Sequence, residues 1–263
     1  MQHYSGKIAT INWIGVWTLY KREVWRFVKV WNQTVLAPVV TTLLFLAVLM
    51  LALGDNAREV EGLNFDRFIA PGLVMMALVQ NAFANSSSSL MLSKIQGVII
   101  DLLMPPFTPG EQTFCLVAGG VTRGIVVGIA VTAAVYAFVP LNVYAPLLAV
   151  VYVLLASALL ALLGVLTGIW AQSFDQLSAI TNYIVTPLAF LSGTFYSIHH
   201  LPEFWQMMSH LNPLFYMIDG FRYAMTGYSD GEPVVGVIVL LATNLLLWLL
   251  AQWLLAKGYR LKT

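Results

Sequence analysis

Residues 143–171 read VYAPLLAVVYVLLASALLALLGVLTGIWA and contain no Asp, Glu, Lys or Arg. A run of about 20 apolar residues is long enough to cross the hydrocarbon core of a bilayer as a helix. A single backbone segment in contact with lipid satisfies its hydrogen bonds internally only when it is helical. This stretch therefore predicts a transmembrane helix.

The composition of the whole chain also indicates a membrane protein. Of its 263 residues, 59% are hydrophobic and only 10% are charged, and the mean hydropathy is +0.81. Soluble domains carry about a quarter charged residues because their surface faces water, so most of this surface is expected to face lipid. The net charge of +1 disfavours nucleic acid as a partner. A single cysteine, Cys115, cannot form an intrachain disulfide.

Five further apolar runs lie on either side of residues 143–171. Their ranges are Thr34–Leu53, Phe68–Leu92, Thr113–Val139, Ala179–Ser197 and Pro233–Ala256. We therefore expect an all-α integral membrane protein with six transmembrane helices, built as one domain over residues 1–263. Six spans place both termini on the same side of the membrane.

The distribution of Lys and Arg predicts which side that is, because these residues accumulate in cytoplasmic segments. Nine of them fall on the side of the termini and three on the opposite side, with Arg123 near a span end. The nine are Lys7, Lys21, Arg22, Arg26, Lys29, Lys94, Lys257, Arg260 and Lys262, and the three are Arg58, Arg67 and Arg222. Both termini are therefore expected in the cytoplasm.

Residues 11–31, before the first span, predict a helix of another kind. Aromatic and aliphatic side chains recur there at intervals of three and four, and basic side chains occupy much of the remaining surface. The first group is Trp17, Tyr20, Val24, Phe27, Val28 and Trp31, and the second is Lys21, Arg22, Arg26 and Lys29. Such a helix lies in the headgroup plane with its basic side toward anionic lipid, although packing on a soluble partner is an alternative.

Two connecting segments are too long for simple loops. Residues 93–112 read SKIQGVIIDLLMPPFTPGEQ, where Val98–Met104 predicts a short helix that Pro105 and Pro106 end. Residues 198–232 are too apolar for a solvated loop, and Asn212-Pro213 divides them into two short helices. We expect this second segment to be a re-entrant outer helix pair between spans five and six.

Polar and small residues inside the spans carry the remaining signals. Asn81, Asn85 and Ser89 share one face of the second span, where they either bond to another helix or line a wet path. Asp219 and Arg222 are spaced i, i+3 and are expected to form a structural ion pair. Two G-x-x-x-G clusters, Gly120-Gly124-Gly128 and Gly164-Gly168, predict close helix packing within the chain.

Arg123 is open to two interpretations, because it either reaches the headgroups or pairs with Asp101 or Glu111. The sequence shows no catalytic motif and no metal-ligand motif. No G-x-x-x-x-G-K-[ST] motif occurs, so ATP is not expected to bind to this chain. Adjacent His199 and His200 suit one metal ion poorly, because neighbours on a helix point about 100° apart.

Three stretches resemble ABC-2 type transporter permeases, the membrane subunits of bacterial exporters of polysaccharides, nodulation factors and drugs. These are FIAPGLVMMALVQNAFANSSSS (68–89), KIQGVIIDLLMPPFTPGE (94–111) and TPLAFLSGTFYSIHHLPEFWQMMSHLNPLFYMIDGFRYAMTG (186–227). The resemblance implies a homodimer in the bacterial inner membrane, joined to two separate ATPase subunits that bind ATP and Mg. It also implies that residues 93–112 form the coupling loop docking on the ATPase. The matching residues are Lys94, Gly97, Asp101, Leu102, Pro105, Pro106 and Glu111.

The resemblance further suggests export of a lipid-linked glycan, a lipid or a hydrophobic drug. A translocation path is expected at polar and aromatic residues of the second and fifth spans, namely Asn81, Asn85, Tyr183, Phe190 and Tyr196. Two other functions stay open. One is a polytopic membrane enzyme acting on lipid, and the other is a non-transporting subunit that transmits ATPase motion to an external partner.

Overall fold

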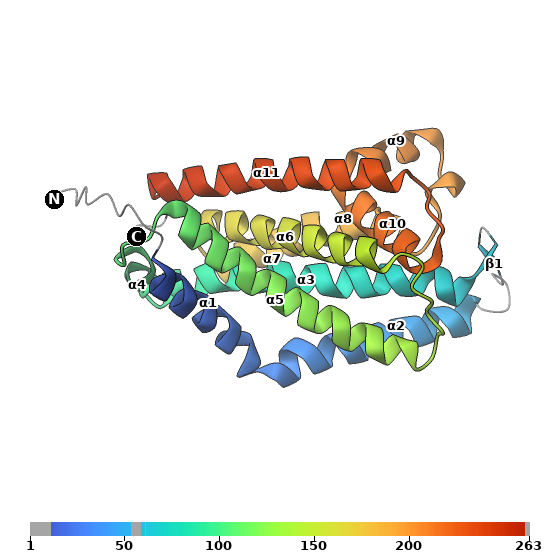
Figure 1. Ribbon diagram of the computed structural model, residues 1–263, viewed down its shortest axis with the longest axis horizontal. Helices are drawn as coiled ribbons and strands as arrows, with labels where there is room; N and C mark the ends of the chain where they lie inside the picture. Colours follow the sequence, from blue (N-terminus) through green and yellow to red (C-terminus); the bar gives the residue numbers. More distant parts are fainter. Residues whose placement is uncertain (1–11, 54–58, 61, 261–263) are drawn as a thin grey trace.

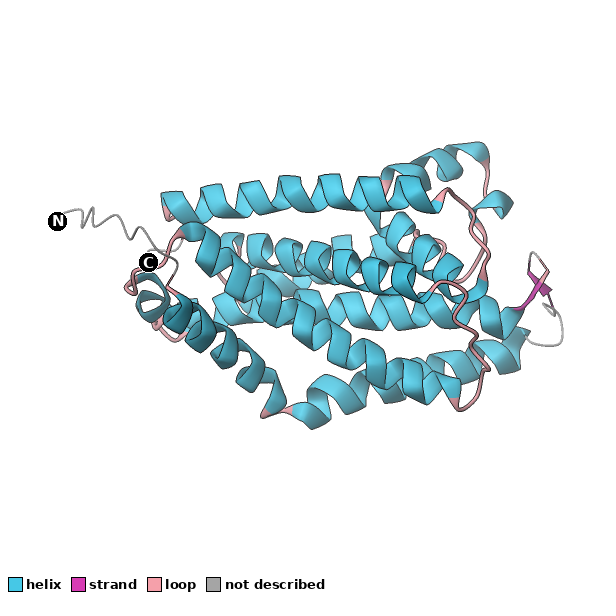
Figure 2. Cartoon of the chain, in the orientation of Figure 1, coloured by secondary structure: helices cyan, strands magenta, loops and turns pink. Residues whose placement is uncertain are grey.

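The computed structural model describes residues 12–53, 59–60 and 62–260, which form a bundle of helices lying roughly along one direction (Figure 1). Within these residues, five helices are long and apolar enough to cross a membrane. They are Asn32–Ala52, Phe65–Ile95, Pro109–Tyr136, Pro146–Trp170 and Pro233–Lys257. The expectation of an all-α integral membrane protein is confirmed. The described residues also include a small hairpin of two strands of two residues each, β1 (Glu59–Val60) and β2 (Leu63–Asn64), visible in Figure 2.

The predicted fifth span differs from the observed helix. A helical run begins earlier, with α7 (Phe174–Ile180), a π-helical turn (Thr181–Val185) and α8 (Thr186–Phe190). It ends at Phe190, short of the expected Ser197, in a turn where Gly193 has a φ of 71°. In Figure 1 this run leads from the end of the bundle where α6 (Pro146–Trp170) finishes to the end where the next helices lie. It is shorter than the five long helices, so its length alone does not mark it as a span.

Prolines account for two irregular turns in the bundle. Pro38 follows the π-helical turn Asn32–Leu36 at the start of α2 (Ala37–Leu53), and Pro187 follows the π-helical turn Thr181–Val185. Proline donates no backbone hydrogen bond, so the regular ladder of the helix is interrupted one turn before it. A wider turn of the backbone accommodates that interruption.

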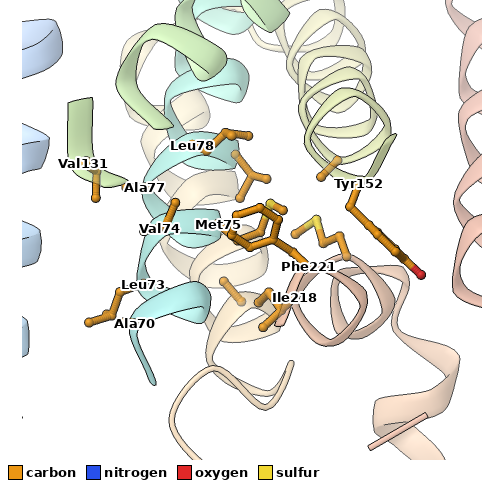
Figure 3. Packing of buried hydrophobic residues seen from close by; sticks show 14 of the residues in the cluster. Ala70, Leu73, Val74, Met75, Ala77, Leu78, Val131, Tyr152, Ile218 and Phe221 are labelled. Carbon is orange, nitrogen blue, oxygen red and sulfur yellow. The ribbon is translucent and has the colours of Figure 1, made fainter. Parts of the chain in front are cut away.

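Helix α3 (Phe65–Ile95) is the centre of the bundle, buried along most of its length and packed against α5 (Pro109–Tyr136) and α6. Figure 3 shows its side chains Val74, Met75 and Leu78 gathered with Phe221 of α10 (Pro213–Thr226) in the core. The glycine clusters permit this packing. A Cβ on Gly120 would lie 2.5 Å from the Ser86 side-chain oxygen, and one on Gly164 would lie 2.6 Å from the Phe83 carbonyl. The predicted packing of these glycines within the chain is therefore confirmed.

Helix α1 (Trp13–Val28) contacts the bundle with a face that the sequence pattern did not select. Its buried residues are Val16, Leu19, Glu23 and Phe27, which repeat at three- and four-residue spacing and pack mainly on α5. In contrast, Trp17, from the predicted apolar stripe, is 63% exposed. Trp17, Val28 and Trp31 of the predicted stripe thus lie on the outside of the molecule, and their contact with a membrane surface stays a prediction.

Residues 198–232 do form two main helices separated at Asn212-Pro213. They are α9 (Glu203–Leu211) and α10, preceded by a short 3₁₀ turn (Ile198–His200). The Asn212 side chain accepts a hydrogen bond from the Leu214 amide and caps α10. Helix α10 is buried against α3, α6 and α11 (Pro233–Lys257), whereas α9 keeps large apolar side chains such as Phe204 exposed. The inner helix of the pair is therefore covered by protein along most of its length.

Candidate functional site

Two cavities join on one side of α3 and form a continuous depression with both polar and apolar walls. The first, of about 460 Å³, lies between α2, α3 and α8, and the second, of about 500 Å³, lies between α3 and residues 177–186. Gln80, Asn81 and Thr186 line both. We call the two cavities together the polar groove. Its other polar lining residues are Gln33, Thr41, Thr42, Ser87, Ser88, Ser178, Thr181 and Asn182.

The predicted path residues are divided by the structure. Asn81 and Phe190 line the polar groove, whereas Tyr183 and Tyr196 do not. Tyr183 is 81% exposed on the outside of its helix, and the Tyr196 hydroxyl donates to the Phe190 carbonyl at 3.3 Å. Asn85 lies one turn from Asn81 on α3, is fully buried and faces α1 instead of the groove.

Several groove residues were missed by sequence reasoning. Gln80 and Asn182 are amides within apolar helices, and Thr41 and Thr42 are adjacent hydroxyls in α2. A search for all amide and hydroxyl side chains within the spans would have found them. Their convergence on one groove could not be read from the sequence, because it depends on how α2, α3 and α8 are rotated about their axes.

Asn85 belongs to a buried charged network between α1 and α3. Glu23 of α1 is fully buried, and its carboxylate lies 3.3 Å from the guanidinium of Arg26. The Ser89 hydroxyl donates to the same carboxylate at 2.8 Å. Arg26 in turn donates to the Asn85 side-chain oxygen at 3.1 Å and to the Ser88 hydroxyl at 2.9 Å. The polar face of α3 therefore holds α1 in place through a fully enclosed carboxylate.

Burial lowers the pKa of Arg26, and the adjacent Glu23 carboxylate opposes that effect. An arginine in this position stays charged because its ordinary pKa is far above neutrality. The charge of Glu23 is therefore matched inside the protein, as a buried carboxylate requires.

Arg123 does not form the expected ion pair with Asp101 or Glu111, and its contact with headgroups stays a prediction. Its guanidinium donates to the Asn81 side-chain oxygen at 3.0 Å, and the Asn81 amide nitrogen donates to the Ala77 carbonyl at 2.9 Å. Within the described residues, no ion pair joins Arg123 to Asp101 or Glu111. The side chain turns toward α3 because Asn81 supplies an acceptor there. A cation is thus placed directly behind the wall of the polar groove.

The predicted coupling loop contains the expected short helix, α4 (Ile99–Leu103), with Val98 and Met104 as its caps. Gly97 precedes it with a φ of 71°, a conformation that favours glycine. Asp101 and Pro106 are exposed, Pro105 is half-buried, and Met104 is 78% exposed. Leu102 lies in α4, and its side chain is outside the described part of the structure.

Two charged residues of this loop are bound within the protein. Lys94 donates to the carbonyls of Ile169 and Ala171, which ties the end of α3 to the end of α6. Glu111 forms a capping box with Thr108 at the start of α5 and accepts a 2.9 Å hydrogen bond from the Asn12 amide. The loop is thereby connected directly to the beginning of α1.

Sequence comparison decides the family. The profile of the ABC-2 type transporter family matches residues 15–226, most of the chain. This chain belongs to the ABC-2 type transporter family. The inner membrane transport permease YadH of Escherichia coli K12 is 38% identical over 244 residues, covering 91% of this chain and 95% of YadH.

Two more distant relatives of this ABC-2 permease are nodulation proteins. Nodulation protein J of Neorhizobium galegae is 25% identical over 83% of this chain and 82% of its own length. Nodulation protein J of Rhizobium leguminosarum bv. trifolii is 27% identical, with 87% and 85% covered. The family match, the similarity to YadH and the five long apolar helices together identify a multi-pass inner membrane transport permease. They point to a transport subunit instead of an enzyme.

The end of the ABC-2 permease opposite α4 holds a second buried charge cluster, where the predicted Asp219–Arg222 ion pair needs correction. The fully buried Arg222 has its carboxylate partner in Asp230, at 3.7 Å, and donates to the Phe68 and Gly193 carbonyls. Asp219 instead accepts hydrogen bonds from the amides of Asp230 and Gly231 and from a serine hydroxyl. The i, i+3 spacing brought the two side chains near each other, but the loop after α10 supplies both with closer partners.

Proposed function

We propose that this permease is the membrane subunit of an ATP-driven exporter that moves an amphipathic or hydrophobic substrate out across the inner membrane. The polar groove is the observation that carries the proposal. Amides and hydroxyls are costly in lipid unless they bond to protein or line a wet path. In this chain they line two joined cavities along three helices. A lipid-linked glycan or a lipid, with a polar head and an apolar tail, suits a groove with both kinds of surface.

The assembly follows from the shape of the groove. Both cavities open to the outside of a single copy, so one chain alone does not enclose a path. A second copy facing the groove would close it, which supports the homodimer that the family resemblance implies. In this arrangement residues 174–190 act as a sixth, short crossing, and both termini lie in the cytoplasm with most of the Lys and Arg.

The ATPase subunit is proposed to act on the permease through α4. Its exposed apolar side chains, among them Ile100 and Met104, offer a docking surface for a separate ATPase subunit that binds ATP and Mg. Figure 1 shows α4 at the same end of the bundle as the start of α1 and the end of α11. Two such ATPases would draw together on binding ATP and displace the two copies of α4.

A chain of contacts leads from α4 toward the groove. Glu111, at the end of the coupling loop, bonds to the Asn12 amide before α1. Arg26, near the other end of α1, bonds to Asn85 on α3, one turn from the groove residue Asn81. Movement of the loop would thus reach α3 through α1.

Reconstitution with a candidate ATPase subunit tests the proposal. ATPase activity is measured in vesicles against a panel of lipids, glycolipids and drugs, and stimulation by one class is expected. Gln80→Leu, which removes an amide shared by both cavities, should reduce that stimulation, whereas Val126→Leu on the outside of α5 should not. If Gln80→Leu is stimulated as strongly as the unaltered protein, the assignment of the path is refuted.

Docking is tested separately by deleting residues 98–104. The deletion is expected to abolish co-purification of the ATPase while the chain still inserts in the membrane. Continued co-purification would show that another surface binds the ATPase.

A further inference from the structure

Two other cavities meet on the side of the bundle formed by α3, α5, α6 and α10. The larger, of about 630 Å³, has walls that are almost entirely carbon. It is lined by Val74 and Leu78 of α3 and by small residues, among them Ala133 on α5 and Ala149 on α6. We call this cavity the apolar trough. Its volume falls within the range of small-molecule sites.

The neighbouring cavity, of about 450 Å³, has both polar and apolar walls. It is lined by Arg67, Asn142, Tyr144 and Thr226 at the end of the bundle away from α4 (Figure 1). Leu141, Val143 and Met225 line both this cavity and the apolar trough. The two are therefore one depression, with a long carbon-lined part and a polar mouth.

Arg67 gives the mouth a positive charge. Its side chain is half-buried at the start of α3, and only its backbone amide is engaged by the neighbouring Asp66 carboxylate, at 2.7 Å. None of the ion pairs within the described residues involves Arg67. A guanidinium is suited to two parallel hydrogen bonds to a phosphate.

We propose that this depression is a binding site for a glycerophospholipid with an anionic headgroup, such as phosphatidylglycerol. One acyl chain lies in the apolar trough, and the phosphate lies at Arg67. The depression follows helices long enough to span a membrane, and its charged mouth is at the end of α3, where headgroups are found. Carbon surface in the trough and a cation at the mouth match the two ends of such a lipid.

The site is preformed and separate from the polar groove. The Ala145 amide donates to the Ala224 carbonyl at 2.9 Å, and Tyr144 packs edge-on against Tyr223 with centroids 5.7 Å apart. These contacts hold residues 137–145 over the mouth, which lowers the entropy lost on binding. No residue lines both the trough and the polar groove. In this proposal, which rests on the polar groove as the substrate path, the lipid stays bound as a resident ligand apart from the exported substrate.

Native mass spectrometry of the detergent-purified full chain tests this site. The protein is incubated with phosphatidylglycerol or with phosphatidylcholine carrying the same acyl chains, and bound lipid is counted as collision energy rises. The unaltered protein is expected to retain phosphatidylglycerol preferentially, and Arg67→Gln to lower its apparent affinity roughly tenfold. Lys257→Gln, a loss of an exposed cation at the opposite end of the bundle, should leave retention unchanged.

The trough is tested with Ala133→Phe, which fills it, against Ala256→Phe, at an exposed alanine on α11 that lines neither cavity. Only Ala133→Phe should reduce binding of both lipids. Equal retention of the two lipids by the unaltered protein, or an Arg67→Gln variant indistinguishable from it, would overturn the proposal. Equal binding by the two phenylalanine variants would also overturn it. If Ala133→Phe does not fold, as judged by its melting temperature, the Arg67 comparison decides.

Discussion

The guanidinium of Arg26 in α1 donates a 3.1 Å hydrogen bond to the side-chain oxygen of Asn85 in α3, 59 residues further along the chain. Glu23 keeps that guanidinium in place and is itself fully buried. An amphipathic helix that only rested on lipid would have no need of an enclosed carboxylate. Helix α1 is therefore fixed to the bundle by specific polar contacts, which can be tested.

Replacement of the buried carboxylate should loosen α1. Glu23→Gln removes the charge that balances Arg26, whose side chain is 26% exposed. Because Arg26 is partly exposed, the free energy of unfolding should fall by less than for a fully buried pair, by about 1–3 kcal/mol. Thermal unfolding in detergent, followed by tryptophan fluorescence, measures it. Lys21→Gln, an exposed cation on the same helix, is the control, and equal melting temperatures for the two variants would contradict the prediction.

Loss of the Glu111 carboxylate should release the coupling loop from α1. Glu111→Ala removes the capping box of α5 and the acceptor of the Asn12 amide. Caps of this kind contribute about 0.5–2 kcal/mol. Hydrogen exchange should become faster at the amides of Asn12, Thr108 and Glu111.

Glu203→Ala is the matched control for that measurement. Glu203 also lies in the first turn of a helix, α9, but takes part in no capping box. Unchanged exchange at Asn12 in Glu111→Ala would show that the contact does not hold α1 in solution.

The pairing of Arg222 with Asp230 should be among the strongest constraints on the fold. Arg222→Met leaves a buried carboxylate without its cation and two carbonyls without their donor. Breaking such a pair costs about 3–5 kcal/mol. Arg222→Lys should recover little of this stability, since one ammonium group does not reproduce the planar set of donors of a guanidinium.

A double-mutant cycle separates pairing from packing. If the two side chains interact, Arg222→Met with Asp230→Asn should destabilise the protein by less than the sum of the single changes. Arg260→Met, at an exposed arginine, controls for the loss of a cation. Strict additivity in the cycle would rule out the interaction.

Close packing of α3 and α5 should depend on Gly120. Its Cβ would lie 2.5 Å from the Ser86 side-chain oxygen and 2.9 Å from the Ala82 carbonyl. Gly120→Leu should therefore lower the yield of monodisperse protein and its melting temperature, since overpacking typically costs about 1–3 kcal/mol or more. Val126→Leu, on the exposed side of the same helix, should behave like the unaltered chain, and similar behaviour of both variants would contradict this packing role.

Much of the helical framework was predictable from local sequence. Uninterrupted apolar runs predict all five long helices within a few residues of those observed, because a span needs about 20 apolar residues. The Asn212-Pro213 break and the short helix ended by Pro105 and Pro106 were also predictable, since proline and its neighbours act locally. The glycine spacing on α5 indicated close packing for the same reason.

Other features depended on contacts between distant segments. In a membrane protein, apolar residues face lipid as readily as protein, so the aromatic stripe of α1 did not reveal that Glu23 lies on the buried face. The early end of the predicted fifth span at Phe190 depends on a turn at Gly193, whose carbonyl accepts a hydrogen bond from Arg222. The sequence spacing of Asp219 and Arg222 suggested a pair, but a loop beyond α10 delivered Asp230 instead.

The sequence by itself determined that this chain is a helical inner membrane permease and which family it belongs to, because span length, hydropathy and family motifs are written in consecutive residues. The tertiary structure alone decided which amides and hydroxyls meet in the polar groove and where each buried charge finds its partner. The physical reason is that such partners lie far apart in the chain, as Glu23 and Ser89 do, and meet only when helix rotation and packing are set. Polar groups in a low-dielectric interior must be satisfied, but many partners would satisfy them equally well.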